Sequence, residues 1–196
     1  MDAFFVSTVS VALAEIGDRS MFLAVLFGIR YQRPWPVFWG MALGLFLNQL
    51  LSAMVGVWFA QLVDPQWLGW IVGIVFLVMA VWVLIPEADE GEPKTLSGRG
   101  LFLTAAVAFF VLEMADKTQL AVIALAGVYQ TVVPVALGAS VGILLLTAPA
   151  LWLGHRFADL LPVRTLNIIA SLLFLLLAAW MFLGAAGWLP ESILPF

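Results

Sequence analysis

This sequence contains no cysteine and few charged residues. There is one histidine, and only 10% of the 196 residues are charged. A soluble domain carries about 25% charged residues, so the chain has too few to cover a surface that faces water. The absence of cysteine excludes disulfide bonds and thiolate metal sites. Together these absences indicate an integral membrane protein.

Long apolar runs take the place of the missing charge, and 64% of the residues are hydrophobic. A helix needs about 20 apolar residues to cross a membrane, and six stretches are long enough. They cover roughly 3–28, 35–60, 66–86, 100–127, 132–154 and 163–189. These runs are continuously apolar rather than alternating, which is typical of helices and not of transmembrane barrels. The sequence therefore predicts an all-α membrane protein with six transmembrane helices.

The basic residues outside the predicted spans all fall on one side. Six of the eight bases lie in the first, third and fifth loops, namely Arg30, Arg33, Lys94, Arg99, Arg156 and Arg164. The positive-inside rule makes these loops cytoplasmic, so both termini are expected on the opposite side. The start of the chain, MDAFF, has no base and no small-residue cleavage site after it, so no removable signal peptide is expected.

The second half of the chain repeats the first. At an offset of 98 residues the halves align without a gap, and AEIGDRS at 14–20 falls on LEMADKT at 112–118. Spaced glycines coincide in the same register, Gly40 and Gly44 with Gly138 and Gly142. A biased composition produces apolar matches by chance, but not acids, bases and glycines in one register. The chain is therefore an internal repeat.

Each half of the chain, 1–98 and 99–196, holds three predicted spans. Because three is odd, the second half must enter the membrane from the side opposite to the first. The sequence therefore predicts two inverted three-helix repeats. Many secondary transporters have this architecture, with the substrate site at the repeat interface near the middle of the membrane.

Each repeat places two acids near the middle of its first span. On a continuous helix, residues three apart share a face, so Glu15 and Asp18 are expected to project together, as are Glu113 and Asp116. A charged residue at the bilayer centre costs about 2.5–3.5 kcal/mol on insertion scales. We therefore expect these side chains to face the protein interior.

Two bases, Arg19 and Lys117, accompany the four acids and leave a net charge of −2, which matches one divalent cation. Oxygens of Ser20, Thr118 and Gln119 complete a set of hard ligands that suits Mn²⁺, Ca²⁺ or Mg²⁺. The bases can neutralise the site when it is empty. The carboxylates can take up protons when the metal leaves, so the site suits exchange of a cation for protons. The transported ion is a substrate, and no cofactor is expected.

Other polar residues have a structural and a functional interpretation. Those of the second and fifth spans can line the site or make hydrogen bonds between helices; they are Asn48, Gln49, Ser52 and Thr147. The acids of the central loop can gather cations, although such runs are more often only solvated; they are Glu87, Asp89, Glu90 and Glu92. A purely structural role for the motifs, as ion pairs between residues four apart, leaves both aspartates unexplained.

The two motifs resemble the doubled E-x-G-D-[KR]-[ST] signature of the Golgi-type cation/proton exchangers, whose bacterial branch includes manganese exporters. The resemblance covers the whole chain, and it implies that the acids of both motifs bind the transported ion. Two departures make the half-sites unequal, since Ala115 replaces the motif glycine and Met21 stands where the other half has Gln119. The compact length resembles bacterial members and implies a bacterial inner membrane. The positions of the loop bases then place both termini in the periplasm.

The predicted function is that of a secondary transporter, which exports Mn²⁺, or alternatively Ca²⁺, from the cytoplasm in exchange for protons. Rival interpretations are an exporter of amino acids or other small cations and a passive divalent cation channel. An intramembrane aspartyl protease built on Asp18 and Asp116 is disfavoured, because a base follows each aspartate and a glutamate precedes it. The expected partners are a divalent ion, protons and the lipid bilayer. Enzyme activity and nucleic-acid binding are not expected, and a homodimer is compatible with the sequence.

Overall fold

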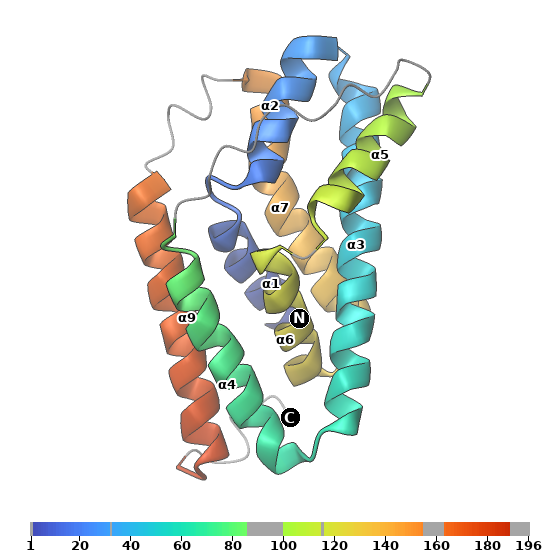
Figure 1. The fold of residues 1–196 in the computed structure, drawn as a ribbon. Helices are drawn as coiled ribbons and strands as arrows, with labels where there is room; N and C mark the ends of the chain where they lie inside the picture. Colours follow the sequence, from blue (N-terminus) through green and yellow to red (C-terminus); the bar gives the residue numbers. More distant parts are fainter. Residues whose placement is uncertain (1, 32, 86–99, 115, 155–162, 189–196) are drawn as a thin grey trace.

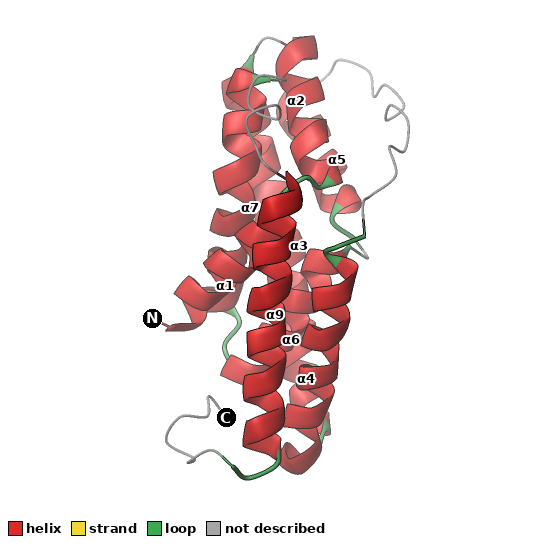
Figure 2. Ribbon diagram, turned by 90° about the vertical axis from the view of Figure 1, so that its left-hand side faces the viewer, coloured by secondary structure: helices red, strands yellow, loops and turns green. Residues whose placement is uncertain are grey.

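Helices make up all the regular structure in the described part of the chain (Figures 1 and 2). The computed structural model describes residues 2–31, 33–85, 100–114, 116–154 and 163–188. Within them lie eight helices and no strand: α1 (Asp2–Ala14), α2 (Arg19–Tyr31), α3 (Pro34–Leu62), α4 (Pro65–Trp82), α5 (Leu101–Leu112), α6 (Lys117–Tyr129), α7 (Val133–Leu153) and α9 (Val163–Ala185). The predicted all-α class is confirmed.

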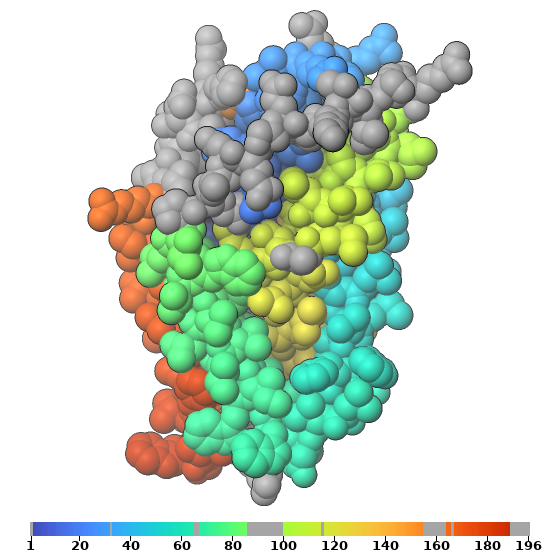
Figure 3. Space-filling view, in the orientation of Figure 1, coloured from blue at the N-terminus to red at the C-terminus, as the bar shows by residue number. Residues whose placement is uncertain are grey.

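Three of these helices are long and apolar enough to cross a membrane by themselves. They are α3, α7 and the part of α9 from Asn167 to Ala185, and they fall on the second, fifth and sixth predicted spans. The helix α4 covers most of the third. Large apolar side chains point outward from the helices, among them Trp58 at 61% exposure and Leu176 at 68%. Figure 3 shows one such face, on which α9, α4, α6, α5 and α3 lie side by side. An apolar exterior of this kind belongs in lipid.

The first and fourth predicted spans are interrupted, so the prediction of continuous helices over 3–28 and 100–127 was wrong. Four residues separate α1 from α2, and four separate α5 from α6. In the first interruption Gly17 has a φ of 78°, a left-handed conformation that commonly ends a helix. In the second, Asp116 has extended backbone (φ −89°, ψ 164°) at the position before α6, which is typical of a residue that starts one.

The four short helices run in line as two pairs, and the longer helices flank them (Figure 1). The main contacts join α1 to α7, α3 to α5 and α4 to α9. Further contacts join α3 to α6 and α2 to α7. The two interruptions therefore lie in the middle of the bundle, where the side chains of Glu15, Asp18, Glu113 and Lys117 are buried.

Glycines set the closest of these contacts. A Cβ added at Gly40 on α3 would overlap the backbone oxygen of Phe102 on α5. A Cβ at Gly138 on α7 would overlap the backbone oxygen of Phe4 on α1. Both members of the second contact differ by 98 residues from those of the first, so one contact occurs twice. Small residues allow this close backbone approach between helices in membranes.

Candidate metal centre

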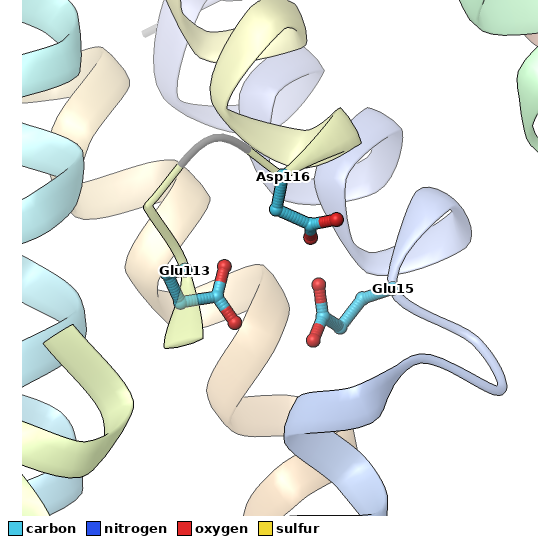
Figure 4. A group of neighbouring side chains, drawn as sticks. All are labelled: Glu15, Glu113 and Asp116. Atoms are coloured by element: carbon cyan, nitrogen blue, oxygen red, sulfur yellow. The ribbon is translucent and has the colours of Figure 1, made fainter. Parts of the chain in front are cut away.

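Three carboxylates meet where the two interruptions face each other (Figure 4). One oxygen from each of Glu15, Glu113 and Asp116 lies within 4.8 Å of the other two. Glu15 is 0% exposed and Glu113 is 2% exposed, whereas Asp116 is partly buried. Ligands on opposite sides of a Ca²⁺ ion bound at 2.3–2.6 Å are about 5 Å apart, so one small adjustment would bring all three oxygens onto a single divalent ion.

The ends of the short helices favour a cation between the glutamates. Glu15 directly follows α1, and its backbone N–H donates to the carbonyl of Val11 at 3.0 Å. Glu113 directly follows α5, and its N–H donates to the carbonyl of Phe109 at 3.1 Å. The carboxyl-terminal end of a helix carries a negative partial charge. Both glutamates therefore add their charge to a region already suited to a positive ion.

Thr118, in the first turn of α6, lies against two of the three carboxylates. Its hydroxyl is 3.1 Å from Oε2 of Glu113 and 3.2 Å from Oδ2 of Asp116. The residue is 0% exposed. A hydroxyl at this place can donate to one carboxylate and present its oxygen to an ion. Of the predicted hydroxyl ligands, Thr118 is the one for which the structure gives contacts with the carboxylate cluster.

The fourth acid of the motifs, Asp18, forms an ion pair with the other half of the chain. Its Oδ2 lies 3.0 Å from Nζ of Lys117, and both side chains are at most 4% exposed. The expectation that Asp18 projects together with Glu15 from one helix face was wrong, because residues 15–17 form a turn and Asp18 directly follows it. The second predicted base, Arg19, has an exposed side chain.

A chain of hydrogen bonds links the helices beside the cluster. The amide nitrogen of Gln119 donates to Oγ of Ser52 at 3.1 Å, and that hydroxyl donates to the backbone oxygen of Asn48 at 2.9 Å. The amide nitrogen of Asn48 donates to the backbone oxygen of Phe110 on α5 at 2.9 Å. Asn48 and Ser52 therefore belong to a chain of hydrogen bonds between helices, as the structural interpretation predicts. Gln119, predicted as a ligand, ties α6 to α3 by its nitrogen.

Several buried polar groups have no hydrogen-bond partner in the described part of the chain. They include both carboxylate oxygens of Glu15, both amide atoms of Gln49 and the hydroxyl of Ser20. Each of these residues is at most 2% exposed. Unsatisfied groups of this kind are costly, and a cation would provide a partner for the Glu15 oxygens. The hydroxyl of Thr147 instead donates to the carbonyl of Ile143 in its own helix.

Some residues singled out in the sequence lie outside the described residues. They are Glu87, Asp89, Glu90, Glu92, Lys94, Arg99, Ala115 and Arg156.

Sequence reasoning missed the interruptions and the pairing of Lys117 with Asp18 across the two halves. A signal for the first was present. Gly17 followed by Asp18 combines a residue that ends helices with one that starts them, yet the apolar residues on both sides favoured one continuous helix. The cross-pairing had no signal in the sequence, because it depends on how the two repeats face each other.

The family of the chain follows from comparison with known proteins. Residues 3–91 and 101–188 match the family model described as "Divalent cation/proton antiporter GDT1". The chain belongs to the GDT1 family. This confirms the resemblance to cation/proton exchangers that the doubled motif carries. A GDT1 member is a membrane transporter and not an enzyme, so the protease interpretation of the aspartates is set aside.

Similar proteins occur in bacteria and in plants. A Vibrio cholerae protein named "Putative manganese exporter" is 37% identical over 179 residues, which covers 91% of this chain and 89% of the relative. A GDT1-like protein of Synechocystis is 27% identical over 91% of this chain and 95% of its own length. "GDT1-like protein 3" of Oryza sativa subsp. japonica is 28% identical over 89% of this chain and 71% of its own length. No solved structure matches the chain.

Proposed function

We propose that this GDT1 protein exports Mn²⁺ from the cytoplasm in exchange for protons, and that Glu15, Glu113 and Asp116 bind the ion. The observation that carries the proposal is the meeting of these carboxylates at the centre of the bundle. Carboxylate oxygens suit hard divalent cations, and the chain has no cysteine to offer a softer one. The relative named for manganese export supports Mn²⁺ over Ca²⁺.

Proton exchange follows from the charge of the cluster. Three ionised carboxylates carry a formal charge of −3, and the neighbouring Asp18 and Lys117 neutralise each other. Without a cation, this much like charge in a buried site is strongly unfavourable. Protons can replace the metal on the same oxygens, so the two compete. The return of the empty site across the membrane then carries protons in the opposite direction to the metal.

The architecture that we propose for this transporter is an inverted repeat with six spans. The helices α1 and α2 have 13 residues each, which at 1.5 Å per residue gives about 20 Å, less than the 30 Å hydrocarbon core. Joined end to end, α1 with α2 and α5 with α6 each form one broken span. The two ranges that match the family model begin 98 residues apart, at 3 and 101, which is the offset of the repeat. Transporters with inverted repeats bind ions at such broken helices.

The proposed orientation places the upper end of Figure 1 in the cytoplasm of a bacterial cell and both termini in the periplasm. Arg30 lies in the last turn of α2, Arg33 precedes α3, and Arg164 lies in the first turn of α9. All three are exposed, and these helix ends lie in the upper half of the view. The positive-inside rule assigns that end to the cytoplasm.

The test is transport by the purified protein in sealed liposomes that contain a pH-sensitive dye. An imposed Mn²⁺ gradient should drive metal across the membrane and move protons the other way, and Glu15→Gln liposomes should do neither. A parallel Ca²⁺ gradient ranks the two ions, and faster exchange of Ca²⁺ would replace Mn²⁺ as the substrate. Metal flux without proton movement would identify a channel, and transport of amino acids with no metal flux would also overturn the proposal.

A further inference from the structure

The two motifs occupy different states in one structure, although their acids and bases correspond position by position. At the offset of 98 residues, Asp18 corresponds to Asp116 and Arg19 to Lys117. Asp18 is held by the buried Lys117 at 3.0 Å. Asp116 joins the two glutamates in the carboxylate cluster. The base next to Asp116 is buried, and the base next to Asp18 is exposed.

The packing of the helices around the two motifs is also unequal. The helix α4 contacts α6, and α9 contacts α1. In Figure 1, α1 and α6 are the short helices that lie below α2 and α5. The repeat counterparts of these contacts, α9 with α2 and α4 with α5, have no comparable extent in the described residues. Burial follows the packing. Ser10 on α1 is 1% exposed and Ala14 is 0% exposed, whereas their counterparts on α5, Ala108 and Leu112, are partly exposed.

We propose that Asp18 and Asp116 alternate as ligands of the metal. The aspartate that does not bind the metal forms an ion pair with the base of the other motif. In the present arrangement Lys117 holds Asp18, and Asp116 completes the site. In the opposite arrangement Arg19 holds Asp116, Asp18 joins the two glutamates, and α4 with α9 packs against α2 and α5. This inference rests on the proposed transport function and specifies how its ion site is rebuilt on each side of the membrane.

The charges favour this alternation. A buried ammonium group needs a counter-ion, since breaking a buried pair is strongly destabilising. An aspartate that binds a divalent cation pairs less strongly with a buried base, because the cation and the base repel each other. The arrangement with one aspartate on the metal and the other on the base is therefore the more favourable one. Glu15 and Glu113 belong to both arrangements, so the ion keeps two carboxylates while the third is exchanged.

Equivalent substitutions at the two bases test the proposal, since they should act in opposite directions. The chain has no native cysteine, so Ser10→Cys and Ala108→Cys serve as matched single reporters at equivalent positions. Labelling rates are measured without metal, with a membrane-impermeant thiol reagent and in sealed vesicles of both orientations, so that each reporter is exposed to the reagent from its own side. Lys117→Gln should raise labelling at position 10 relative to 108, and Arg19→Gln should lower it. A bias of one or two kcal/mol changes such a ratio about 5–30-fold. Shifts in the same direction, or no shift, would overturn the proposal.

A second measurement separates alternation from a site that uses all four acids at once. The double variant Asp18→Asn/Lys117→Gln removes the ion pair as a unit and leaves the present cluster intact. It should bind one Mn²⁺ with an affinity within about tenfold of the unmodified chain, whereas Asp116→Asn should lose at least about tenfold more. The double variant should also stop exchanging metal for protons. Loss of Mn²⁺ binding as severe as in Glu113→Gln, in a double variant that elutes as a folded protein, would show that Asp18 is a simultaneous ligand.

Failure of this inference is distinguishable from failure of the proposed function. The unmodified chain in the same vesicles reports exchange directly. If it exchanges Mn²⁺ for protons while both base variants leave the labelling ratio unchanged, only the alternation is wrong. If the unmodified chain moves no metal, the proposed function fails, whatever the reporters show.

Discussion

The motif after α1 and the motif after α5 have nearly the same sequence and unequal roles. The first contributes Glu15 to the carboxylate cluster and commits Asp18 to an ion pair. The second contributes two carboxylates, Glu113 and Asp116, and its lysine supplies the base of that pair. A repeated sequence motif therefore does not imply a symmetric site. A carrier that opens to one side at a time must break its symmetry in each state.

The neighbours of the motifs extend this difference. Gln119 donates to Ser52 and so ties α6 to α3. Its counterpart in the first half is Met21, which is 1% exposed and apolar. This difference is written in the sequence, so it persists in every conformation, unlike the exchange of ion-pair partners. The second half is therefore the more firmly held side of the site. Four predictions test how far the two halves differ.

The largest effect is expected where the halves contribute alike. Glu15→Gln and Glu113→Gln each remove one carboxylate from the cluster. Loss of groups that only support metal ligands costs 10–100-fold, so loss of a ligand should lower Mn²⁺ transport at least about 100-fold in both variants. Flux of radioactive or dye-detected Mn²⁺ into liposomes measures this. Near-native transport by one variant only would show that a single half binds the ion.

The next effect should separate the two bases. Lys117→Gln leaves the buried Asp18 without its partner, which costs about 3–5 kcal/mol of stability in the metal-free protein. Arg19→Gln alters an exposed side chain, where an ion pair contributes no more than about 1 kcal/mol, so stability should change by at most that amount. Thermal unfolding in detergent compares them, with Asp18→Asn/Lys117→Gln as the control that should recover most of the loss. Equal destabilisation by the two single variants would contradict the assigned pairing.

Smaller and equal effects are expected at the duplicated glycine contact. A Cβ at Gly40 or at Gly138 meets backbone and not a flexible side chain, so the helices must separate. Overpacking of this kind costs about 1–3 kcal/mol. Gly40→Ala and Gly138→Ala should therefore lower the unfolding temperature by similar amounts. A loss confined to one variant would mean that the two contacts are not equivalent.

The smallest effect is expected at the position where the halves differ in sequence. Gln119→Met gives the second half the residue of the first and removes the hydrogen bond to Ser52. One hydrogen bond contributes about 0.5–1.5 kcal/mol, so stability should fall by that amount. Mn²⁺ affinity, measured by calorimetry, should change less than in Glu15→Gln. A loss of affinity as large as in that variant would make Gln119 a direct ligand, as the sequence first suggested.

The sequence predicted the parts of this molecule that depend on composition and register. Apolar runs predicted the positions of α3, α7 and α9 within a few residues, because a long apolar run is the main requirement for a helix that faces lipid or the protein interior. The repeat located both motifs and hence the acids of the cluster. The carboxylates were found because charges in apolar runs have few other uses.

The remaining features depend on tertiary contacts that periodicity does not report. The helix breaks after Ala14 and Leu112 interrupt apolar runs whose composition is that of one continuous helix. The partner of Lys117 is 99 residues away in the chain, at Asp18. Local rules favour partners four residues apart and could not select it. The roles of Asn48 and Ser52 likewise followed from their facing backbone and side chains on α5 and α6.

The central claim is that one divalent ion and protons compete for Glu15, Glu113 and Asp116. The most direct measurement is calorimetric titration of Mn²⁺ into the purified protein over about two pH units around neutrality, in buffers of different ionisation enthalpy. Affinity should fall as the pH falls, binding should release protons, and Glu15→Gln should abolish the release. Mn²⁺ binding that is independent of pH and releases no protons would contradict it.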